Sequence, residues 1–501
     1  MKELALHRFE AAGRAILVIV CAGFVAADLF IVCSRITYPY QLEWMEGASL
    51  VQVSRLLAGH SLYGPPSIEY VPLIYPPLYF YVAAALARAA GVGFAALRLV
   101  SCLSSAGCAA LLFAAVREKT GSRFAGLLAV GCFASTFVLT GQWFDIARTD
   151  MLAAALSMLG IYLARDRADG YTGLLLAGAA LACAFLSKQS ALIVCIEAVC
   201  YFLIVDRRRA VALGLTMAAS LAAVYGIFWL NSAGWINYYL FAIPAAHAFD
   251  LSFGRILSVL VGQLRPVAVF LLAGLLPLIL TPGEWLRDRS YRYYACMAAG
   301  LIATGVAGRL NAFSGPNVYV PTYLGVALLL GLEAGWLSDP ARRANFRTGL
   351  VLLQWALVGA QFLVLVPAYL QTKTIPTAQD RAAGDMLVAR IRSYAGDVLL
   401  LDNNYLALYA GKTPYFNEMP MSEISGQGNL HSMPQWPALQ KQIAALLHAP
   451  TTDAAIVDFA LPIQPMIAGC RQQAIPYADK IVFEPVAGPP NSRPSLIITC
   501  R

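Results

Sequence analysis

Charged residues are scarce in this chain. They make up 13% of its 501 residues, whereas a soluble protein of this length carries about 25%. Hydrophobic residues make up 59%, the mean hydropathy is +0.64, and the apolar residues come in long runs such as Ala15–Ala27, Leu174–Leu186 and Val267–Leu280. The composition therefore excludes an ordinary soluble protein and indicates a membrane protein. The net charge of +8 does not indicate a nucleic-acid partner, because the arginines form short clusters between apolar runs.

Histidine is also scarce, and this bears on metal binding. The chain has five histidines without metal-ligand spacing, and His247 stands alone in a predicted outer loop, so we expect no histidine-based metal site. Nine of the eleven cysteines lie in or near apolar runs, where cysteine is usually a small buried side chain. Cys470 and Cys500 lie in the polar C-terminal region. They are either free thiols or, if that region is external, a disulfide.

The apolar runs predict a protein with about eleven membrane spans, since a spanning helix needs about 20 apolar residues. The first run is too long for a signal peptide and lacks a clear small-residue cleavage site, so we interpret it as a retained span. Tyr75–Ala90 is ambiguous, because it is apolar but only about 16 residues long and begins with prolines. The predicted spans are 14–33, 97–116, 122–141, 150–164, 171–187, 190–205, 210–230, 258–281, 293–308, 316–337 and 347–368.

The distribution of positive charge resolves the ambiguity. If 75–90 stays outside the bilayer and the N-terminus is cytoplasmic, the inner segments hold 17 Lys and Arg in about 45 residues and the outer segments hold 8 in about 115. If 75–90 crossed, the later loops would flip and Arg207–Arg209 would face outward. The positive-inside rule therefore predicts a long first external loop, 34–96, and an external C-terminus.

The C-terminal region, from about residue 371, has a different pattern. Residues 397–402 and 453–460 indicate buried strands, 437–449 a helix, and 480–500 a pair of strands interrupted by Gly-Pro-Pro-Asn. We therefore expect an α-helical polytopic domain over 1–370 and a small extracytoplasmic α/β domain over 371–501. The membrane part has no recognisable internal repeat, which disfavours an inverted-repeat transporter.

On this topology, most unusual polar residues gather on the outer face. Polar groups beside a membrane core are costly, so their gathering suggests a water-filled reaction cavity. A carboxylate there could take a proton from an acceptor hydroxyl, while cations stabilise the charge on a departing phosphate. The residues are Glu43, Glu46, Glu69, Tyr75, Arg98, Asp145, Arg148, Asp150, Lys188, Gln189, Arg309, Asn311, Asn317 and Tyr319.

Several of these residues have a simpler interpretation, which stays open at this point. Glu43 and Glu46 could be an ordinary acidic loop, and Arg148 with Asp150 a structural ion pair at a helix start. Lys188, like Arg98 and Arg309, could simply extend to the membrane interface. Asp28, within the first span, fits a buried structural acid better than a catalyst. The aromatic runs 75–81 and 235–239 fit interfacial anchors.

The sequence of the first external loop, LEWMEGASLVQVSRLLAGHSLYGPPSIEYVPLIYPPLYFYVAAAL, resembles that of the GT-C glycosyltransferases. It is closest to the bacterial branch related to protein O-mannosyltransferases and the lipid A aminoarabinose transferase. Further pieces agree in order: Arg98, FDIARTDMLAAALSMLGIYLA, FLSKQSAL, GRLNAFSGPNVYVPTYL and, near the C-terminus, GDVLLLDNNYLALYAGKTPYF. The resemblance covers nearly the whole chain.

The resemblance implies inverting transfer of a sugar from a polyprenyl-phosphate donor at the outer face of the bacterial inner membrane. The acceptor would be a membrane lipid or a cell-envelope glycan. No cofactor is implied; dependence on a divalent metal varies in the superfamily, and we expect none here. Glu46, which precedes Gly47 as in the family motif, is the first candidate base and Glu43 the second. Many relatives place an aspartate where this chain has Met45, so which of the two glutamates acts stays open.

The remaining roles follow from the same likeness. The implied lipid-phosphate ligands are Arg98, Lys188 and Arg309, and the other residues implied to line the site are Tyr75, Arg148, Asp150, Gln189, Asn317 and Tyr319. The competing functions are a polysaccharide polymerase or ligase and a lipid-linked-sugar transporter or flippase. A polymerase or ligase typically relies on Arg and His in a late external loop, whereas the acidic residues here lie in the first loop.

Overall fold

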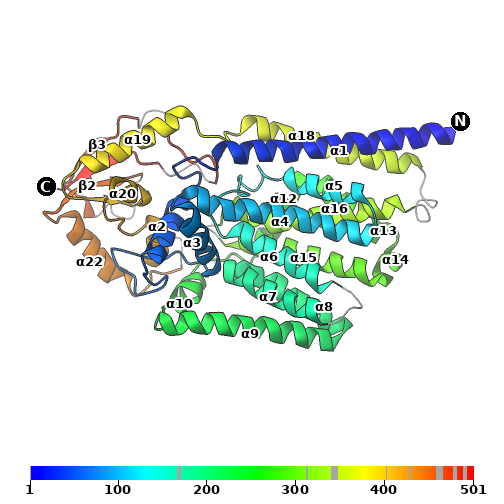
Figure 1. The fold of residues 1–501 in the computed structure, drawn as a ribbon, viewed down its shortest axis with the longest axis horizontal. Coiled ribbons are helices and arrows are strands. Elements are labelled where there is room, and N and C mark those ends of the chain that lie inside the picture. The colour runs from blue at the N-terminus through cyan, green and yellow to red at the C-terminus, as the bar shows by residue number, and fades with distance from the viewer. Residues whose placement is uncertain are drawn as a thin grey trace.

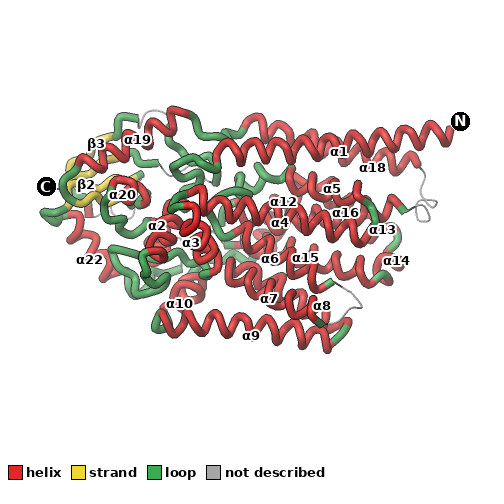
Figure 2. Tube along the Cα trace, in the orientation of Figure 1, coloured by secondary structure: helices red, strands yellow, loops and turns green. Residues whose placement is uncertain are grey.

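The computed structural model describes residues 2–165, 171–311, 314–339, 348–401, 403–427, 430–458, 466–477, 482–488 and 493–500. The described part is a long helical bundle with a small mixed sheet at one end (Figures 1 and 2). Residues 166–170 of the predicted inner segment 165–170 and the whole of the predicted inner segment 341–347 lie outside the described residues.

Each of the eleven predicted spans contains a helix or two consecutive helices in the described part of the chain, as the composition predicts. They are α1 (Lys2–Arg35), α4 (Phe94–Thr120), α5 (Arg123–Ala134), α6 (Asp150–Ala164), α7 (Thr172–Ser187), α8 (Leu192–Val205), α9 (Arg207–Asn231), α12 (Phe253–Leu264) with α13 (Ala268–Leu280), α15 (Arg289–Leu310), α16 (Val320–Ser338) and α18 (Thr348–Gln371). Six of these segments, namely those of α1, α4, α9, α12–α13, α16 and α18, are long and apolar enough to cross a membrane. The short elements between them are η1 (Gln189–Ala191), α10 (Trp235–Asn237), η2 (Tyr238–Ala242), α11 (Ile243–Ala245), η3 (Arg265–Val267), α14 (Pro282–Arg287) and η4 (Pro316–Tyr319).

Helix α16 forms the centre of the bundle and packs against α5, α13 and α15. Small residues let its neighbours approach closely, as is common where helices pack in a membrane. A β-carbon at Gly331 would lie against Val116 and Ala129, and one at Gly335 would overlap Thr120. The close contacts explain why α16 is buried along nearly its whole length.

The arrangement of the first external loop agrees with its predicted position. Its helices are α2 (Glu46–Leu57) and α3 (Leu78–Ala90). With 13 residues, α3 extends about 20 Å, less than the ~30 Å of a hydrocarbon core. Both helices lie at the end of the bundle that faces the C-terminal region, and the N-terminus lies at the opposite end (Figure 1).

The C-terminal region folds around a four-stranded sheet with the order β1-β2-β4-β3. Strands β1 and β2 are parallel, whereas β4 runs antiparallel to β2 and β3. Its apolar side chains share one core with those of α2 and α3, so this region and the first external loop form a continuous structure. The elements are α19 (Ala378–Ser393), β1 (Asp397–Leu400), α20 (Tyr405–Ala410), α21 (Glu418–Ser425), α22 (Trp436–Leu447), β2 (Thr452–Val457), β3 (Arg471–Ala474) and β4 (Leu496–Thr499).

The strand pair predicted over 480–500 is wrong in part. Strand β4 is present, but residues 482–488 contain no strand, and β4 pairs instead with β3. All four residues of β3 are exposed, so its Arg-Gln-Gln-Ala sequence has no alternating apolar face by which it could be predicted. Residues 402, 459–460, 480–481 and 489–492 of the predicted strands lie outside the described residues.

Candidate functional site

The candidate site lies where the first external loop meets the segment that joins α5 to α6. Arg35, at the end of α1, connects the two segments. Its Nε donates to Asp145 Oδ2 over 2.7 Å, its Nη1 donates to Gln142 Oε1 over 2.7 Å, and the Arg35 and Asp145 side chains are fully buried. Buried charges are tolerated when they are paired and hydrogen-bonded, so this pair anchors the two segments to each other.

Glu46 and Arg98 form a second buried ion pair, and each side chain is 0% exposed. Arg98 donates from Nε to Glu46 Oε1 over 3.0 Å and from Nη2 to Oε2 over 2.7 Å. The backbone N–H groups of Leu42 and Ala147 donate to the other acceptor positions of the carboxylate, over 2.6 and 2.7 Å. Arg98 also donates to the backbone carbonyls of residues 35, 36, 38 and 40.

This geometry does not fit the roles expected for Glu46 and Arg98 from the sequence. The four acceptor positions of the Glu46 carboxylate are occupied by donors, which leaves none for the proton of an acceptor hydroxyl. Arg98 is enclosed and neutralised by Glu46, and its other donors are directed to backbone carbonyls. The pair instead fixes the start of α2 against α4.

Glu43 is also fully buried, but only one of its two carboxylate oxygens is hydrogen-bonded. Its Oε2 accepts from the backbone N–H of Met45 over 3.1 Å and from Arg148 Nη1 over 3.2 Å. Its Oε1 is buried and has no hydrogen-bond partner within the described residues. Burial raises the pKa of Glu43 to about 7, against the opposing effect of Arg148. A carboxyl group with this pKa can exchange a proton near neutral pH.

Arg148 connects Glu43 to the aromatic start of the 75–90 segment. Its Nη2 donates to the Tyr75 hydroxyl over 2.8 Å, and its guanidinium lies 5.1 Å from the Tyr75 ring centroid. Burial raises the pKa of Tyr75 to about 12, so its hydroxyl is a neutral donor and acceptor. Gln189 holds this segment in place because its Nε2 donates to Ile74 O over 2.6 Å.

Asp150, at the first residue of α6, is the centre of a second polar group. Its Oδ1 accepts from Lys188 and, over 2.7 Å, from Asn317 Nδ2. Its Oδ2 accepts from Trp143 Nε1 over 3.0 Å. A cavity of about 30 Å³ adjoins the group, and its lining includes Asp150, Lys188, Asn317 and apolar residues of α6, α8 and α16. Residues from four separate parts of the sequence thus meet beside α6.

Arg309 lies in the last turn of α15 and is partly exposed. Its Nε donates to the Tyr319 hydroxyl over 3.3 Å, and its Nη1 donates to the Ser314 carbonyl over 3.0 Å. Within the described residues it has no carboxylate partner. The short helix η4 carries both Tyr319, bonded to Arg309, and Asn317, bonded to Asp150. Arg309 is therefore close to the Asp150 group and retains its charge for another ligand.

His247 and Asp28 lie apart from this polar group and have structural contacts. His247 Nε2 lies 2.6 Å from Glu423 Oε2 of α21, and its Nδ1 lies 2.7 Å from Asn311 Nδ2. It therefore joins the C-terminal region to the outer loops. Asp28 is partly buried and accepts from the Tyr369 hydroxyl over 2.9 Å, which is a structural contact.

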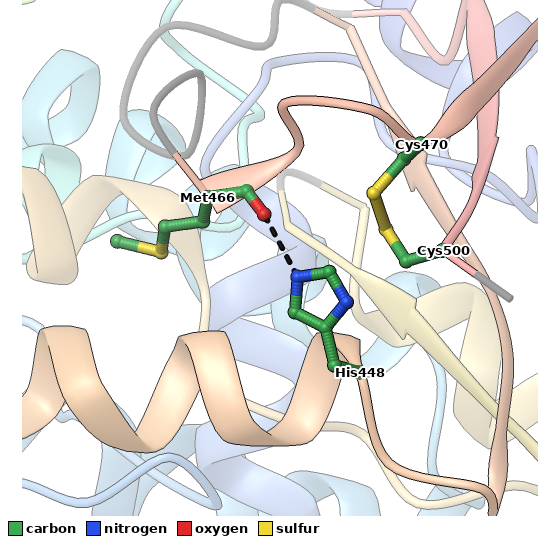
Figure 3. Close-up of a disulfide and its surroundings, with 4 residues drawn as sticks. All are labelled: His448, Met466, Cys470 and Cys500. Atoms are coloured by element: carbon green, nitrogen blue, oxygen red, sulfur yellow. Dashed lines mark hydrogen bonds between the residues drawn. A yellow bond between two sulfur atoms is a disulfide. The ribbon is translucent and has the colours of Figure 1, made fainter.

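Of the two states left open for Cys470 and Cys500, the structure has the disulfide, which lies beside His448 (Figure 3). Within the described residues these three side chains are the only cluster with metal-ligating spacing. The sulfur atoms of Cys470 and Cys500 are bonded to each other, so neither cysteine is a thiolate that could bind zinc. His448 Nε2 instead lies 3.1 Å from the carbonyl oxygen of Met466. The cluster is a structural crosslink at the edge of the sheet.

Trp143 was not among the residues predicted for the site. It bonds Asp150, and its ring centroid lies 5.9 Å from the Arg148 guanidinium. The sequence did contain a signal for Trp143: it lies in GQWFDIARTD, close to the predicted site residues Arg148 and Asp150. A buried indole N–H usually has a hydrogen-bond partner, so a contact with one of them could have been predicted.

Comparison with known proteins agrees with this architecture. Residues 75–232 match the family described as dolichyl-phosphate-mannose-protein mannosyltransferase. The fold is similar to that of ArnT from Cupriavidus metallidurans bound to undecaprenyl phosphate, with 15% identity, a TM-score of 0.58 and coverage of 95% of this chain and 97% of that chain. No protein with a curated description matches this sequence.

A more distant similarity links the chain to the oligosaccharyltransferase of Archaeoglobus fulgidus. The apo form matches with 12% identity and a TM-score of 0.52, covering 88% of this chain and 70% of that chain. The structure of AglB from the same organism with an inhibitory peptide and a dolichol-phosphate matches with the same identity and TM-score, covering 87% and 69%. The predicted GT-C-like fold is thus confirmed, because the chain shares its fold with ArnT and with this oligosaccharyltransferase.

Proposed function

We propose that this protein is an inverting glycosyltransferase, which moves a sugar from a polyprenyl-phosphate donor to an acceptor hydroxyl at the periplasmic face of the bacterial inner membrane. The acceptor hydroxyl loses its proton to a carboxylate base, and its oxygen forms a bond to the anomeric carbon. The bond between that carbon and the phosphate oxygen breaks, which leaves polyprenyl phosphate. The lipid phosphates bound by ArnT and AglB, which share this fold, support the class of donor.

The observation that carries the proposal is the unpartnered, buried Oε1 of Glu43. A base needs an acceptor position that no protein donor occupies, and a pKa near the working pH. Glu43 has both, with a pKa raised to about 7 by burial, whereas all four acceptor positions of Glu46 are occupied by protein donors. We therefore assign the base to Glu43, the second candidate from the sequence, and a structural role to Glu46.

The phosphate of the donor would bind to Arg309 and Lys188. Of the three cations predicted for this role, Arg98 is neutralised by Glu46, and Lys188 is paired with Asp150 but partly exposed. Arg309 bonds only neutral groups within the described residues. Cations placed on a leaving phosphate stabilise the charge that develops there. No cofactor enters this mechanism, and the absence of a metal requirement stays a prediction.

The orientation is part of the same proposal. The N-terminus would be cytoplasmic and the C-terminal region, 371–501, periplasmic, as the excess of Lys and Arg in the predicted inner loops indicates. Two features support this orientation. The N-terminus and the C-terminal region lie at opposite ends of the bundle, and the Cys470–Cys500 disulfide suits an oxidising compartment.

A glutamine scan of the first loop tests the assignment of the base. Transfer would be measured in membrane vesicles, with a panel of radiolabelled undecaprenyl-phosphate hexoses and pentoses as donors and the envelope lipids and glycans of the vesicles as acceptors. We expect Glu43→Gln to lose transfer by about 100-fold or more, as is common when a general base is removed, while binding of undecaprenyl phosphate is kept. Glu69→Gln is the matched control, because Glu69 is exposed in the same loop.

Two outcomes would contradict the proposal. Normal transfer by Glu43→Gln would remove Glu43 as the base. Translocation of a lipid-linked sugar by the wild-type protein and by Glu43→Gln alike, without transfer, would indicate a transporter or flippase in place of a transferase.

A further inference from the structure

Three consecutive residues of the C-terminal region, Val486–Gly488, reach into the junction of the two loops that form the candidate site. Ala487 N donates to Leu42 O over 2.8 Å, and Gly488 N donates to Gly141 O over 3.0 Å. Gln142 Nε2 donates to Val486 O over 2.5 Å. Each of the three residues is therefore bonded to one of the loops that carry Glu43 and Arg148.

Gly488 lies directly against the proposed base. A β-carbon at this position would lie 3.1 Å from Glu43 Cγ and 2.9 Å from Trp143 Cζ3. Gly488 also has a φ of +70°, which glycine adopts without strain. Contacts this short require a residue without a side chain, so the backbone of Gly488 forms a wall of the site.

The neighbouring residues close the same side with apolar surface. Val486 and Ala487 are buried in a cluster with Leu42, Trp143 and Ile146. Within the described residues, Glu43 has no hydrogen bond on Oε1 and two bonds, of 3.1 and 3.2 Å, on Oε2. With one oxygen unbonded, the orientation of the carboxyl group depends strongly on what packs against it.

We infer that Val486–Gly488 is a positioning element of the reaction site, which holds the Glu43 carboxyl group beside Arg148 and excludes water from it. The C-terminal region is then part of the site rather than a separate accessory domain, in agreement with the core that it shares with α2 and α3. The inference rests on the proposed function only where it calls Glu43 the base, because the packing itself does not depend on the reaction.

The test is a pH titration of Glu43 in the purified full-length protein without substrate. Infrared spectroscopy monitors the protonation of the carboxyl group. The carboxyl band that disappears in Glu43→Gln identifies the group. In Gly488→Ala the added methyl group displaces the carboxyl group from Arg148 and removes more water. We therefore expect the midpoint of the Glu43 titration to rise by at least ~0.5 pH units, which is about a threefold change in the protonation equilibrium.

A control and a second variant separate this effect from backbone strain and misfolding. Gly411→Ala is the matched control, because Gly411 has a φ of +72° but nothing within 4 Å of an added β-carbon, and it should leave the Glu43 midpoint unchanged. Val486→Ala loosens the apolar cluster and admits water. The midpoint should then fall toward the ordinary glutamate value by a similar amount.

The outcomes distinguish this inference from the proposed function. Equal midpoints in wild type, Gly488→Ala and Val486→Ala would overturn the positioning role, even if Glu43→Gln were inactive. Shifted midpoints together with normal transfer by Glu43→Gln would overturn the role of Glu43 as base and keep the positioning role. Shifts in opposite directions, together with transfer that weakens at pH 7 in Gly488→Ala and recovers at pH 9, would support both.

Discussion

Replacing Glu46 with glutamine should destabilise the protein rather than only inactivate it. The Glu46 carboxylate accepts two bonds from Arg98 and one each from the backbone N–H groups of Leu42 and Ala147. Glutamine keeps one acceptor oxygen, turns an NH₂ group toward two of these donors and leaves the Arg98 charge buried without a counter-charge. Removing one partner of a buried ion pair costs on the order of 3–5 kcal/mol, a large part of the ~5–15 kcal/mol that stabilises a typical native protein.

The measurement is thermal unfolding of the purified protein in detergent, with the loss of the folded peak on size exclusion as the readout. Glu69→Gln should stay within about 0.5 kcal/mol of wild type, as exposed substitutions usually do. The double variant Glu46→Gln/Arg98→Gln removes both charges, so it should be more stable than the sum of the two single effects predicts. A Glu46→Gln protein that unfolds like wild type but has lost transfer would refute this reasoning and return Glu46 to the role of base.

Further predictions follow from the other contacts. Because burial raises the pKa of Glu43 to about 7, transfer should increase as the pH rises through about 7, since only the deprotonated carboxylate accepts a proton; a flat rate from pH 5 to 9 would contradict this. Arg309→Ala should weaken undecaprenyl phosphate binding about 10- to 100-fold in native mass spectrometry, as expected for loss of a hydrogen bond to a charged group, with Lys119→Ala at the other end of the bundle as control. Cys470→Ala should destabilise the protein by about 3–4 kcal/mol, because the bond closes a loop with a sequence separation of 30. If instead the Cys470 and Cys500 thiols react with a membrane-impermeant maleimide in intact cells without prior reduction, no disulfide forms there.

Much of the architecture could be predicted from the sequence because membrane helices are specified locally. Twenty apolar residues mark a span wherever the chain later packs, and the arginine clusters determine which loops share a face. Length and prolines left Tyr75–Ala90 ambiguous, and the charge distribution predicted that it stays outside the bilayer; its helix α3 lies at the end of the bundle that faces the C-terminal region. Strand β3 could not be predicted in this way, because an exposed edge strand is defined by its partner β4 rather than by its own apolar pattern.

The sequence indicated which polar residues gather on one face, but not which of them pair with each other. Sequence and resemblance predicted that Glu43, Glu46, Arg98, Arg148 and Asp150 share one face, and the structure places them in three ion pairs: Glu46–Arg98, Glu43–Arg148 and Asp150–Lys188. Glu46 is bonded on both oxygens because its partners, which lie about 50 and 100 positions away in the sequence, are close to it in space. The spacing of the two glutamates along the chain does not contain that information. Met45 was the position where the resemblance was weakest, and its backbone N–H is one of the two groups that bond Glu43.

The contribution of the C-terminal region was the least predictable part of the site. Gly488 lies more than 400 residues from Glu43 in the sequence, in a segment without regular structure. Its contact with Glu43 and Trp143 depends on the absence of a side chain, so no chemical group in the sequence marks it.

The most direct test of the central claim is a cryo-electron microscopy structure of the full-length protein with undecaprenyl phosphate. We predict density for the phosphate between Arg309 and Lys188, on the side of the bundle that carries Glu43, with the Glu46–Arg98 pair intact. A phosphate bound to Arg98 with Glu46 displaced, or bound at the end of the bundle that carries the N-terminus, would contradict the account.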